Sequence, residues 1–238
     1  KPVKSFRSYL SYKITSAEDW DVAMEDIRVN IRSLSEPFQF LLDYADTPDA
    51  VDTEGEQFCI AEGALTGRLC TFEGYMCGGQ FGSLGIIDSV RYADSSCFQR
   101  YEYPSSLPAD VQDTIVNISE RVVRQVGLDN TCFNIEFFYN EELNRSFILE
   151  INPRISQSHG DLFQKVDGTA NHEAMIDVAC GQKPNFPQRE GPFPYAAKFM
   201  HRVFMEDGFV RNIPSEEDLR IVRHSYPGAL VDLHVRPG

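Results

Sequence analysis

Apolar and polar residues alternate with a period of two along two neighbouring stretches, residues 132–139 and 146–152. Because successive side chains of a strand point to opposite faces, we predict both stretches to be β-strands. A polar loop centred on Leu143 joins them, which indicates an antiparallel hairpin in which Glu136 lies opposite Glu150. The polar face of this hairpin is predicted to carry Asn134, Glu136, Glu150 and Asn152.

The two opposed glutamates are the most informative feature of this face. Like charges directly opposite each other destabilise a sheet, and a divalent cation between Glu136 and Glu150 would remove that repulsion. Carboxylate and amide oxygens suit Mg²⁺, which binds a few protein carboxylates together with substrate phosphates. The hairpin therefore predicts a metal site. The alternative is a polar sheet edge that faces solvent and binds nothing.

The rest of the pattern predicts a mixture of helices and strands. Ser16, with Asp19 three residues later, is typical of a capping box at the start of a helix. The resulting order favours the α+β class with largely antiparallel sheets. The predicted elements are strands at 8–14, 58–62, 69–76 and 81–89, helices from Ser16, from Pro108 to Gly127 and at 171–180, a loop at 91–107, and short strands with turns between 195 and 235.

Composition limits the classes of partner. With 238 residues, of which 42% are hydrophobic, the chain is long enough to bury a sizeable core. Its net charge of −14 argues against nucleic acids and anionic membranes as partners. No run of about 18 apolar residues occurs, so no membrane span is expected. The six cysteines lack zinc-site spacing and lie mostly in apolar stretches, which predicts reduced, buried thiols and a cytoplasmic protein.

The hairpin also carries a family motif. Its first strand contains Asn-Ile-Glu-Phe at 134–137, and its second reads Leu-Glu-Ile-Asn-Pro-Arg at 149–154. This pair resembles the metal-binding strands of the ATP-grasp superfamily, closest to the carboxylate–amine ligases related to biotin carboxylase, whose second strand reads E-x-N-x-R. The resemblance implies that Mg²⁺ or Mn²⁺, bridging the phosphates of ATP, is bound by Glu136, Glu150 and Asn152.

Two residues that follow the motif are implied to work beside the metal. By the resemblance, Arg154 is the catalytic residue and faces the transferred phosphate or the substrate carboxylate, for which its guanidinium fork is suited. The alternative for Arg154 is an ordinary arginine on a surface loop. His159 lies five residues further on and is a candidate for contact with the substrate. The alternative for His159 is a solvated loop histidine.

Weaker matches imply an ATP site. Lys1 resembles the lysine that reaches the ATP phosphates, and the segment with Glu62, Ala64 and Leu65 resembles the hinge that holds adenine by backbone hydrogen bonds. Leu149, on the apolar side of its strand, is implied to pack on adenine. The alternatives are a frayed terminal lysine for Lys1, a carboxylate at a strand end for Glu62 and an ordinary core leucine for Leu149.

The resemblance covers roughly residues 1–185 and implies an ATP-grasp fold of two α+β subdomains followed by a small β-rich segment. We expect part of the small subdomain at 1–60, the large subdomain with the metal-binding hairpin at 61–185, and the C-terminal β-rich segment at 186–238. The chain has no initiator methionine and opens on a strand-like Lys-Pro-Val, so we expect a fragment that lacks the family's N-terminal domain.

The activity implied by the resemblance is an ATP- and Mg²⁺-dependent ligase. It would activate a small-molecule carboxylate as an acylphosphate, which an amine, thiol or similar nucleophile then attacks, and a homodimer is among the expected assemblies. Two departures favour an alternative, a catalytically degenerate nucleotide-binding module: residues 3–9 lack the family's glycines, and Leu69 stands where several members carry a ribose-binding glutamate. A purely structural interaction domain is a third alternative.

Overall fold

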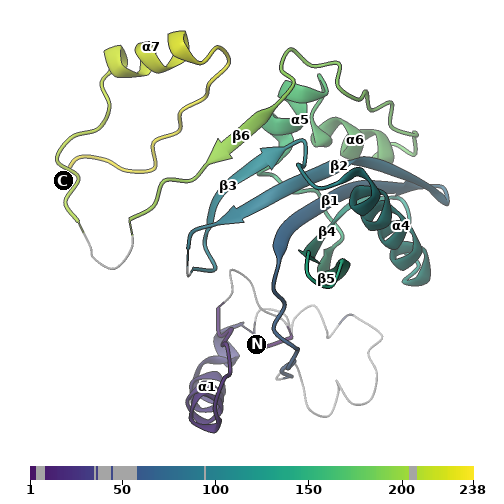
Figure 1. Cartoon of the computed structure of the whole chain (residues 1–238), viewed down its shortest axis with the longest axis vertical. Coiled ribbons are helices and arrows are strands. Elements are labelled where there is room, and N and C mark those ends of the chain that lie inside the picture. The colour runs from purple at the N-terminus through teal and green to yellow at the C-terminus, as the bar shows by residue number, and fades with distance from the viewer. Residues whose placement is uncertain (4–8, 35, 37–43, 45–57, 94, 204–207) are drawn as a thin grey trace. The chain divides into compact units, whose positions relative to one another are not determined.

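Figure 1 shows the computed structural model of the chain. Residues 4–8 of the glycine-free loop at 3–9 are outside the described residues, as is most of the segment 35–57. All structural statements below concern the described residues. These are residues 1–3, 9–34, 36, 44, 58–93, 95–203 and 208–238.

Six strands form one sheet in the order β5-β4-β1-β2-β3-β6. The pairs β1/β2, β2/β3 and β3/β6 are antiparallel, so the predicted α+β class with an antiparallel sheet is confirmed. In chain order the elements are α1 (Ala17–Asn30), β1 (Arg68–Cys77), β2 (Gln80–Arg91), β3 (Phe98–Tyr103), α4 (Ala109–Gln125), β4 (Thr131–Asn140), β5 (Arg145–Asn152), α5 (Gly160–Val166), α6 (Asn171–Ala179), β6 (Ala196–Phe199) and α7 (Glu216–Ser225).

The chain divides into two compact units. The first comprises Lys1–Arg68 and Phe137–Leu149, and the second comprises Leu69–Glu136 and Glu150–Gly238. The division predicted from the sequence, at residues 60/61 and 185/186, stays a prediction.

Helix α1 of the first unit begins as predicted. The Ser16 hydroxyl accepts a hydrogen bond from the Asp19 backbone N–H at 3.1 Å, and the Asp19 carboxylate accepts one from the Ser16 N–H at 3.0 Å. This reciprocal pair satisfies backbone donors that have no partner within the helix. The helix buries one side in a small cluster. The members of this cluster are Leu10, Ile27, Ile31 and Leu34.

The core of the second unit lies on both faces of the sheet. On one face, the fully buried Phe72 and Phe133 have ring centroids 6.0 Å apart, and Phe81 stacks on Phe72 at 5.9 Å. Cys132 points to the opposite face, because neighbouring side chains of a strand alternate. There it belongs to a buried cluster with residues of α5 and α6, including Phe163 and Val178. The face that carries Cys132 therefore also carries Asn134 and Glu136.

Several predicted elements differ from the structure. The predicted strand at 8–14 is not formed, since its described part has no strand and Leu10 has a left-handed φ of 55°. The predicted strand at 58–62 is reduced to an isolated bridge between Pro2 and Cys59. The predicted loop at 91–107 contains β3, and α5 was not expected.

The C-terminal segment is not β-rich in the described residues, which corrects the sequence-based expectation. Between residues 186 and 238 it contains one short strand, β6, and the helix α7. Ser215 starts α7 with a capping box to Asp218, as Ser16 does in α1. The apolar residues of this segment therefore follow a helical period at the point where strands were expected.

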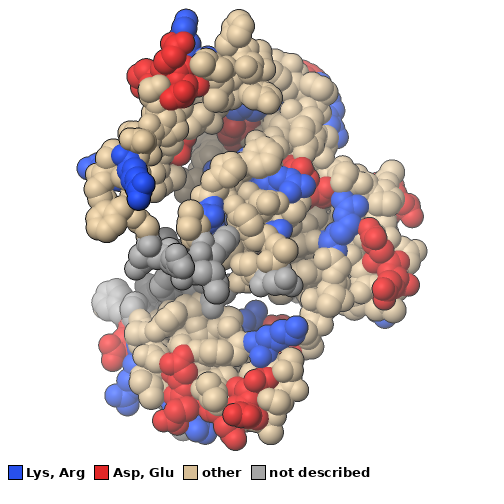
Figure 2. All heavy atoms as spheres, turned by 60° about the vertical axis from the view of Figure 1, so that its left-hand side comes forward, with Lys and Arg blue, Asp and Glu red and all other residues tan. Residues whose placement is uncertain are grey.

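Two further expectations concern the whole chain. Three cysteines are buried as predicted, Cys70, Cys77 and Cys132, whereas Cys59 and Cys180 are exposed. Within the described ranges, no helix combines the length and hydropathy needed to cross a membrane. Figure 2 shows acidic and basic side chains interspersed on the face that it displays.

Candidate metal and nucleotide site

The predicted polar residues of the hairpin come together on one face in the second unit. The Asn152 side-chain amide donates hydrogen bonds to Asn134 Oδ1 at 3.2 Å and to Glu150 Oε1 at 2.9 Å. The contact between Asn134 and Asn152 is the one expected from the predicted register, in which Glu136 lies opposite Glu150. The hairpin therefore presents two carboxylates and two amides to the same side.

Arg154 extends this group. Its guanidinium lies next to Asn152, with Nη2 3.4 Å from Asn152 Oδ1, and its side chain is exposed. Its backbone carbonyl accepts a hydrogen bond from the Asn134 side chain at 2.8 Å. The structure thus places the arginine beside the three predicted metal ligands, where it can meet an anion bound to them.

Glu136 lies close enough to Glu150 for the charge of Glu150 to affect its pKa. Glu136 is half-buried and its pKa is raised, first by burial and then by the charge of Glu150. Arg91, His159 and Arg154 oppose this rise. A half-buried carboxylate that faces a second carboxylate has reason to bind a cation.

The donor set fits Mg²⁺ or Mn²⁺. Glu136, Glu150 and Asn152 offer hard oxygen atoms, which these ions prefer. No group of three or more His, Cys, Asp or Glu side chains arranged to hold a metal occurs in the part of the chain that the structure describes. Two carboxylates and an amide leave coordination positions for phosphate oxygens and water, as is usual for Mg²⁺ at nucleotide sites.

The raised pKa of Glu136 predicts how metal-free stability depends on pH. The folded state holds the proton between the ordinary pKa, near 4.5, and the raised value. The free energy of unfolding should therefore fall as pH rises through this interval. Glu136→Gln removes the titrating group and should therefore weaken the dependence of the free energy of unfolding on pH in this interval. Urea midpoints of both proteins between about pH 4 and pH 8 test this, and parallel profiles would contradict it.

A buried network lies close to the hairpin and was not predicted. Glu73 of β1 is fully buried, and its carboxylate accepts hydrogen bonds from His159 Nδ1 at 2.6 Å and from the Asn171 amide at 2.8 Å. The Ser156 backbone N–H lies 3.3 Å from the same carboxylate. The one sequence signal was a glutamate within an otherwise largely apolar strand.

His159 is part of this network. The residue is 2% exposed, and the edge of its ring meets Tyr101 with centroids 4.9 Å apart. Its contribution to the pKa of Glu136 shows that it lies within electrostatic reach of the hairpin. The bland alternative of a solvated loop histidine is therefore wrong. Contact between His159 and a substrate stays a prediction.

The predicted ATP residues lie in the first unit, and two of them meet. Lys1 Nζ is 3.1 Å from Glu62 Oε2, and the Lys1 carbonyl accepts a hydrogen bond from the Ile60 N–H at 2.9 Å. Lys1 is therefore paired rather than frayed. Ala64 is exposed and Leu65 is half-buried. Their role in adenine binding stays a prediction.

Leu149 has the exposure that a ligand contact requires. Its strand neighbours on the apolar side, Phe147 and Ile151, are half-buried like Leu149 itself. Phe133 and Ile135, the apolar residues of β4, are fully buried. The apolar side of β5 is therefore only partly covered. Packing of Leu149 on adenine stays a prediction.

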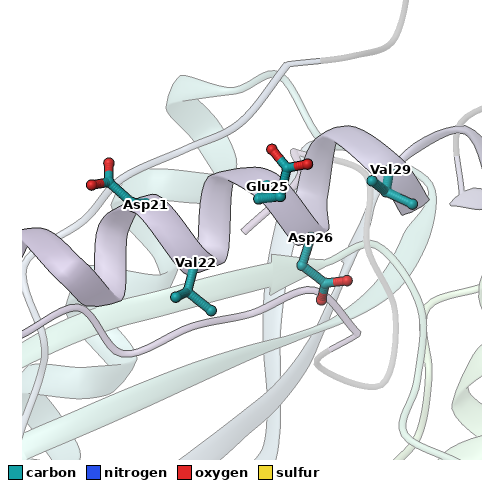
Figure 3. Close-up of a pocket in the computed structure, with 5 residues that line it drawn as sticks. All are labelled: Asp21, Val22, Glu25, Asp26 and Val29. Atoms are coloured by element: carbon teal, nitrogen blue, oxygen red, sulfur yellow. The ribbon is translucent and has the colours of Figure 1, made fainter.

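Figure 3 shows a pocket on α1. All of its lining residues belong to α1, and none is a predicted site residue. They are Asp21, Val22, Glu25, Asp26 and Val29.

Comparisons with known proteins bear on the segment that contains the hairpin. Residues 102–185 match the family model described as "Carbamoyl-phosphate synthase L chain, ATP binding domain". Carnosine synthase 1 of Gallus gallus is 30% identical over 125 residues, which are 52% of this chain and 13% of that protein. The chain thus spans about an eighth of that curated relative.

Solved structures give weaker likenesses. Kluyveromyces lactis urea carboxylase is 21% identical with a TM-score of 0.47, covering 55% of this chain and 12% of that one. The biotin carboxylase domain of Hydrogenobacter thermophilus 2-oxoglutarate carboxylase was solved with MgADP, ADP and bicarbonate. It is 19% identical with a TM-score of 0.45, and the match covers 55% of this chain and 28% of that chain. The family-model match includes the whole E-x-N-x-R motif, and for this segment the predicted resemblance to the ATP-grasp superfamily is confirmed.

Proposed function

We propose that the protein is an ATP- and Mg²⁺-dependent ligase that activates a substrate carboxylate as an acylphosphate. The observation that carries this proposal is one polar face that brings Glu136 and Glu150 together with Asn152, where the charge of Glu150 contributes to the raised pKa of Glu136. This group lies within the segment that matches an ATP-binding domain. A phosphate-bound divalent cation would relieve the repulsion and complete the donor set.

The predicted metal, phosphate and adenine residues each receive a role in this proposal. Glu136, Glu150 and Asn152 would hold the metal, which supplies charge neutralisation at the phosphates. Arg154 would neutralise charge on the transferred phosphoryl group or bind the substrate carboxylate. The ATP itself would be bound by Lys1 at its phosphates, by the segment of Glu62, Ala64 and Leu65 at adenine, and by Leu149 against the adenine ring.

The reaction needs no covalent nucleophile from the protein. A substrate carboxylate oxygen attacks the γ-phosphorus of ATP and ADP leaves, which forms the acylphosphate. An amine or similar nucleophile then attacks the acyl carbon, loses a proton, and inorganic phosphate leaves. The protein contributes by holding the reactants together and by stabilising the developing charge.

A second candidate function is a nucleotide-binding module without ligase activity. Leu69 favours it, because this residue is 7% exposed and apolar, and so supplies no ribose-binding carboxylate. This candidate uses the same metal residues but predicts binding without turnover.

Calorimetry with ATP, in the presence and absence of Mg²⁺, tests the proposal. We expect binding that depends on Mg²⁺, because the metal links the carboxylates to the phosphates. Release of ADP and phosphate should then depend on added carboxylate and amine. Binding without such turnover would favour the module. Absence of Mg²⁺-dependent binding would contradict both functions and support a structural role.

A further inference from the structure

The buried carboxylate of Glu73 has no role in the chemistry proposed above, yet it lies on the same side of the sheet. A carboxylate removed from water is costly unless hydrogen bonds and a positive partner compensate for the lost hydration. Glu73 is fully buried, and its carboxylate accepts hydrogen bonds from His159 and Asn171. A leucine at this position would avoid the cost, so the pair needs another explanation.

The partners of Glu73 converge on one peptide. The Ser156 N–H lies 3.3 Å from Glu73 Oε1, and the Ser156 carbonyl accepts a hydrogen bond from the Asn171 side chain at 3.0 Å. Both backbone polar groups of Ser156 are therefore held by buried side chains. Ser156 follows Arg154 by two residues, so this anchoring fixes the segment directly after the metal motif.

The other end of the same segment is anchored as well. Asn134 is 3% exposed, accepts a hydrogen bond from the Asn152 amide and donates one to the Arg154 carbonyl at 2.8 Å. The Arg154 N–H in turn donates to the Asn152 carbonyl at 2.8 Å. Residues 152–156 are thus held at both ends by buried polar side chains. A predicted metal ligand and the predicted phosphate-binding arginine lie between these anchors.

We propose that Glu73 and His159 are positioning residues, which hold the Ser156 backbone so that Asn152 and Arg154 face the same metal-bound phosphate. This inference rests on the proposed function. Outer partners that orient ligands of a metal site are commonly worth about ten- to a hundredfold in affinity or activity. The pair acts through the loop, since the His159 side chain is buried.

The test compares two substitutions at one residue. His159→Ala removes the Nδ1 donor, whereas His159→Asn keeps an N–H donor at the same number of bonds from Cα. We expect His159→Ala to lower the kcat of carboxylate-dependent ADP release, measured at saturating Mg·ATP, by about ten- to a hundredfold. His159→Asn should recover most of that loss. A merely structural role would change the folded fraction and leave the kcat of the folded protein unchanged.

Tyr103→Phe is the matched control. Tyr103 donates a buried hydrogen bond of 2.7 Å to Asp167 in the same unit, and among the described residues its hydroxyl makes no hydrogen bond with residues 152–159. Tyr103→Phe should lower the urea midpoint of unfolding and leave the kcat of ADP release unchanged. If His159→Ala affects kcat no more than Tyr103→Phe, or if His159→Asn equals His159→Ala, the inference is overturned.

A measurement on the unaltered protein covers variants that fail to fold. Hydrogen exchange at the Ser156 amide should be strongly slowed, because its N–H faces a buried carboxylate. Exchange as fast as in an unstructured chain would overturn the inference. The two proposals fail separately: absence of Mg²⁺-dependent ATP binding in the unaltered protein removes the ligase function, whereas normal binding with unaffected variants removes only the positioning role.

Discussion

Glu150→Gln is expected to lower ATP turnover in the full-length protein by about a hundredfold or more. Glutamine has nearly the same shape as glutamate but lacks the charge that attracts the metal. Its carbonyl can still accept the hydrogen bond that Glu150 receives from Asn152 at 2.9 Å. Loss of activity should therefore occur without loss of the hairpin. The measurement is carboxylate-dependent release of ADP at saturating ATP and Mg²⁺.

The stability of the Glu150→Gln protein, unlike its ATP turnover, should not fall. Because the charge of Glu150 raises the pKa of Glu136, its removal relieves repulsion in the metal-free protein. The urea midpoint at neutral pH should be unchanged or higher. Glu142→Gln is the control, since Glu142 is exposed in the turn of the same hairpin. Full turnover in Glu150→Gln, or an equal loss in Glu142→Gln, would remove Glu150 from the metal site.

Phe72→Ala is expected to destabilise the fold by about 3–5 kcal/mol. Phe72 is fully buried between Phe81 and Phe133, with ring centroids 5.9 and 6.0 Å away. Truncation leaves a cavity among side chains that cannot all move inward to fill it. Urea unfolding followed by fluorescence or circular dichroism gives the free energy of unfolding.

Phe209→Ala is the matched control for this prediction. Phe209 is 88% exposed, so its truncation creates no cavity and should change the free energy of unfolding by less than about 0.5 kcal/mol. Similar effects of the two substitutions would contradict the assignment of Phe72 to the core.

Strong local periodicity explains the parts of the fold that the sequence predicts correctly. The hairpin alternates over its whole length, and α4 has buried residues at helical spacing, such as Val111 and Ile115. Strand β3 was missed because its aromatic residues, Phe98, Tyr101 and Tyr103, do not alternate with a period of two. Helix α5 has seven residues and no side-chain cap at its start, so neither signal of a helix was available.

The residues of the candidate site also divide into those that a local sequence pattern predicts and those that it does not. The polar face of the hairpin depends on neighbouring residues of two adjacent strands, which a local pattern can predict. The partners of Glu73 are Ser156, His159 and Asn171, separated from it by 83, 86 and 98 positions. No local pattern encodes such contacts, because they form only when the loop and α6 pack on the sheet. Sequence reasoning therefore grouped the expected ligands of the metal and singled out His159 as a candidate for substrate contact, but it missed Glu73 and Asn171.

Strand β6 ends the sheet on one side in the portion of the chain described here, and it has only four residues, Ala-Ala-Lys-Phe. An unpaired strand edge is a template on which other molecules can add strands and grow fibrils. Shortness and a lysine both hinder such addition. This margin of the sheet should therefore resist aggregation during long storage at high protein concentration.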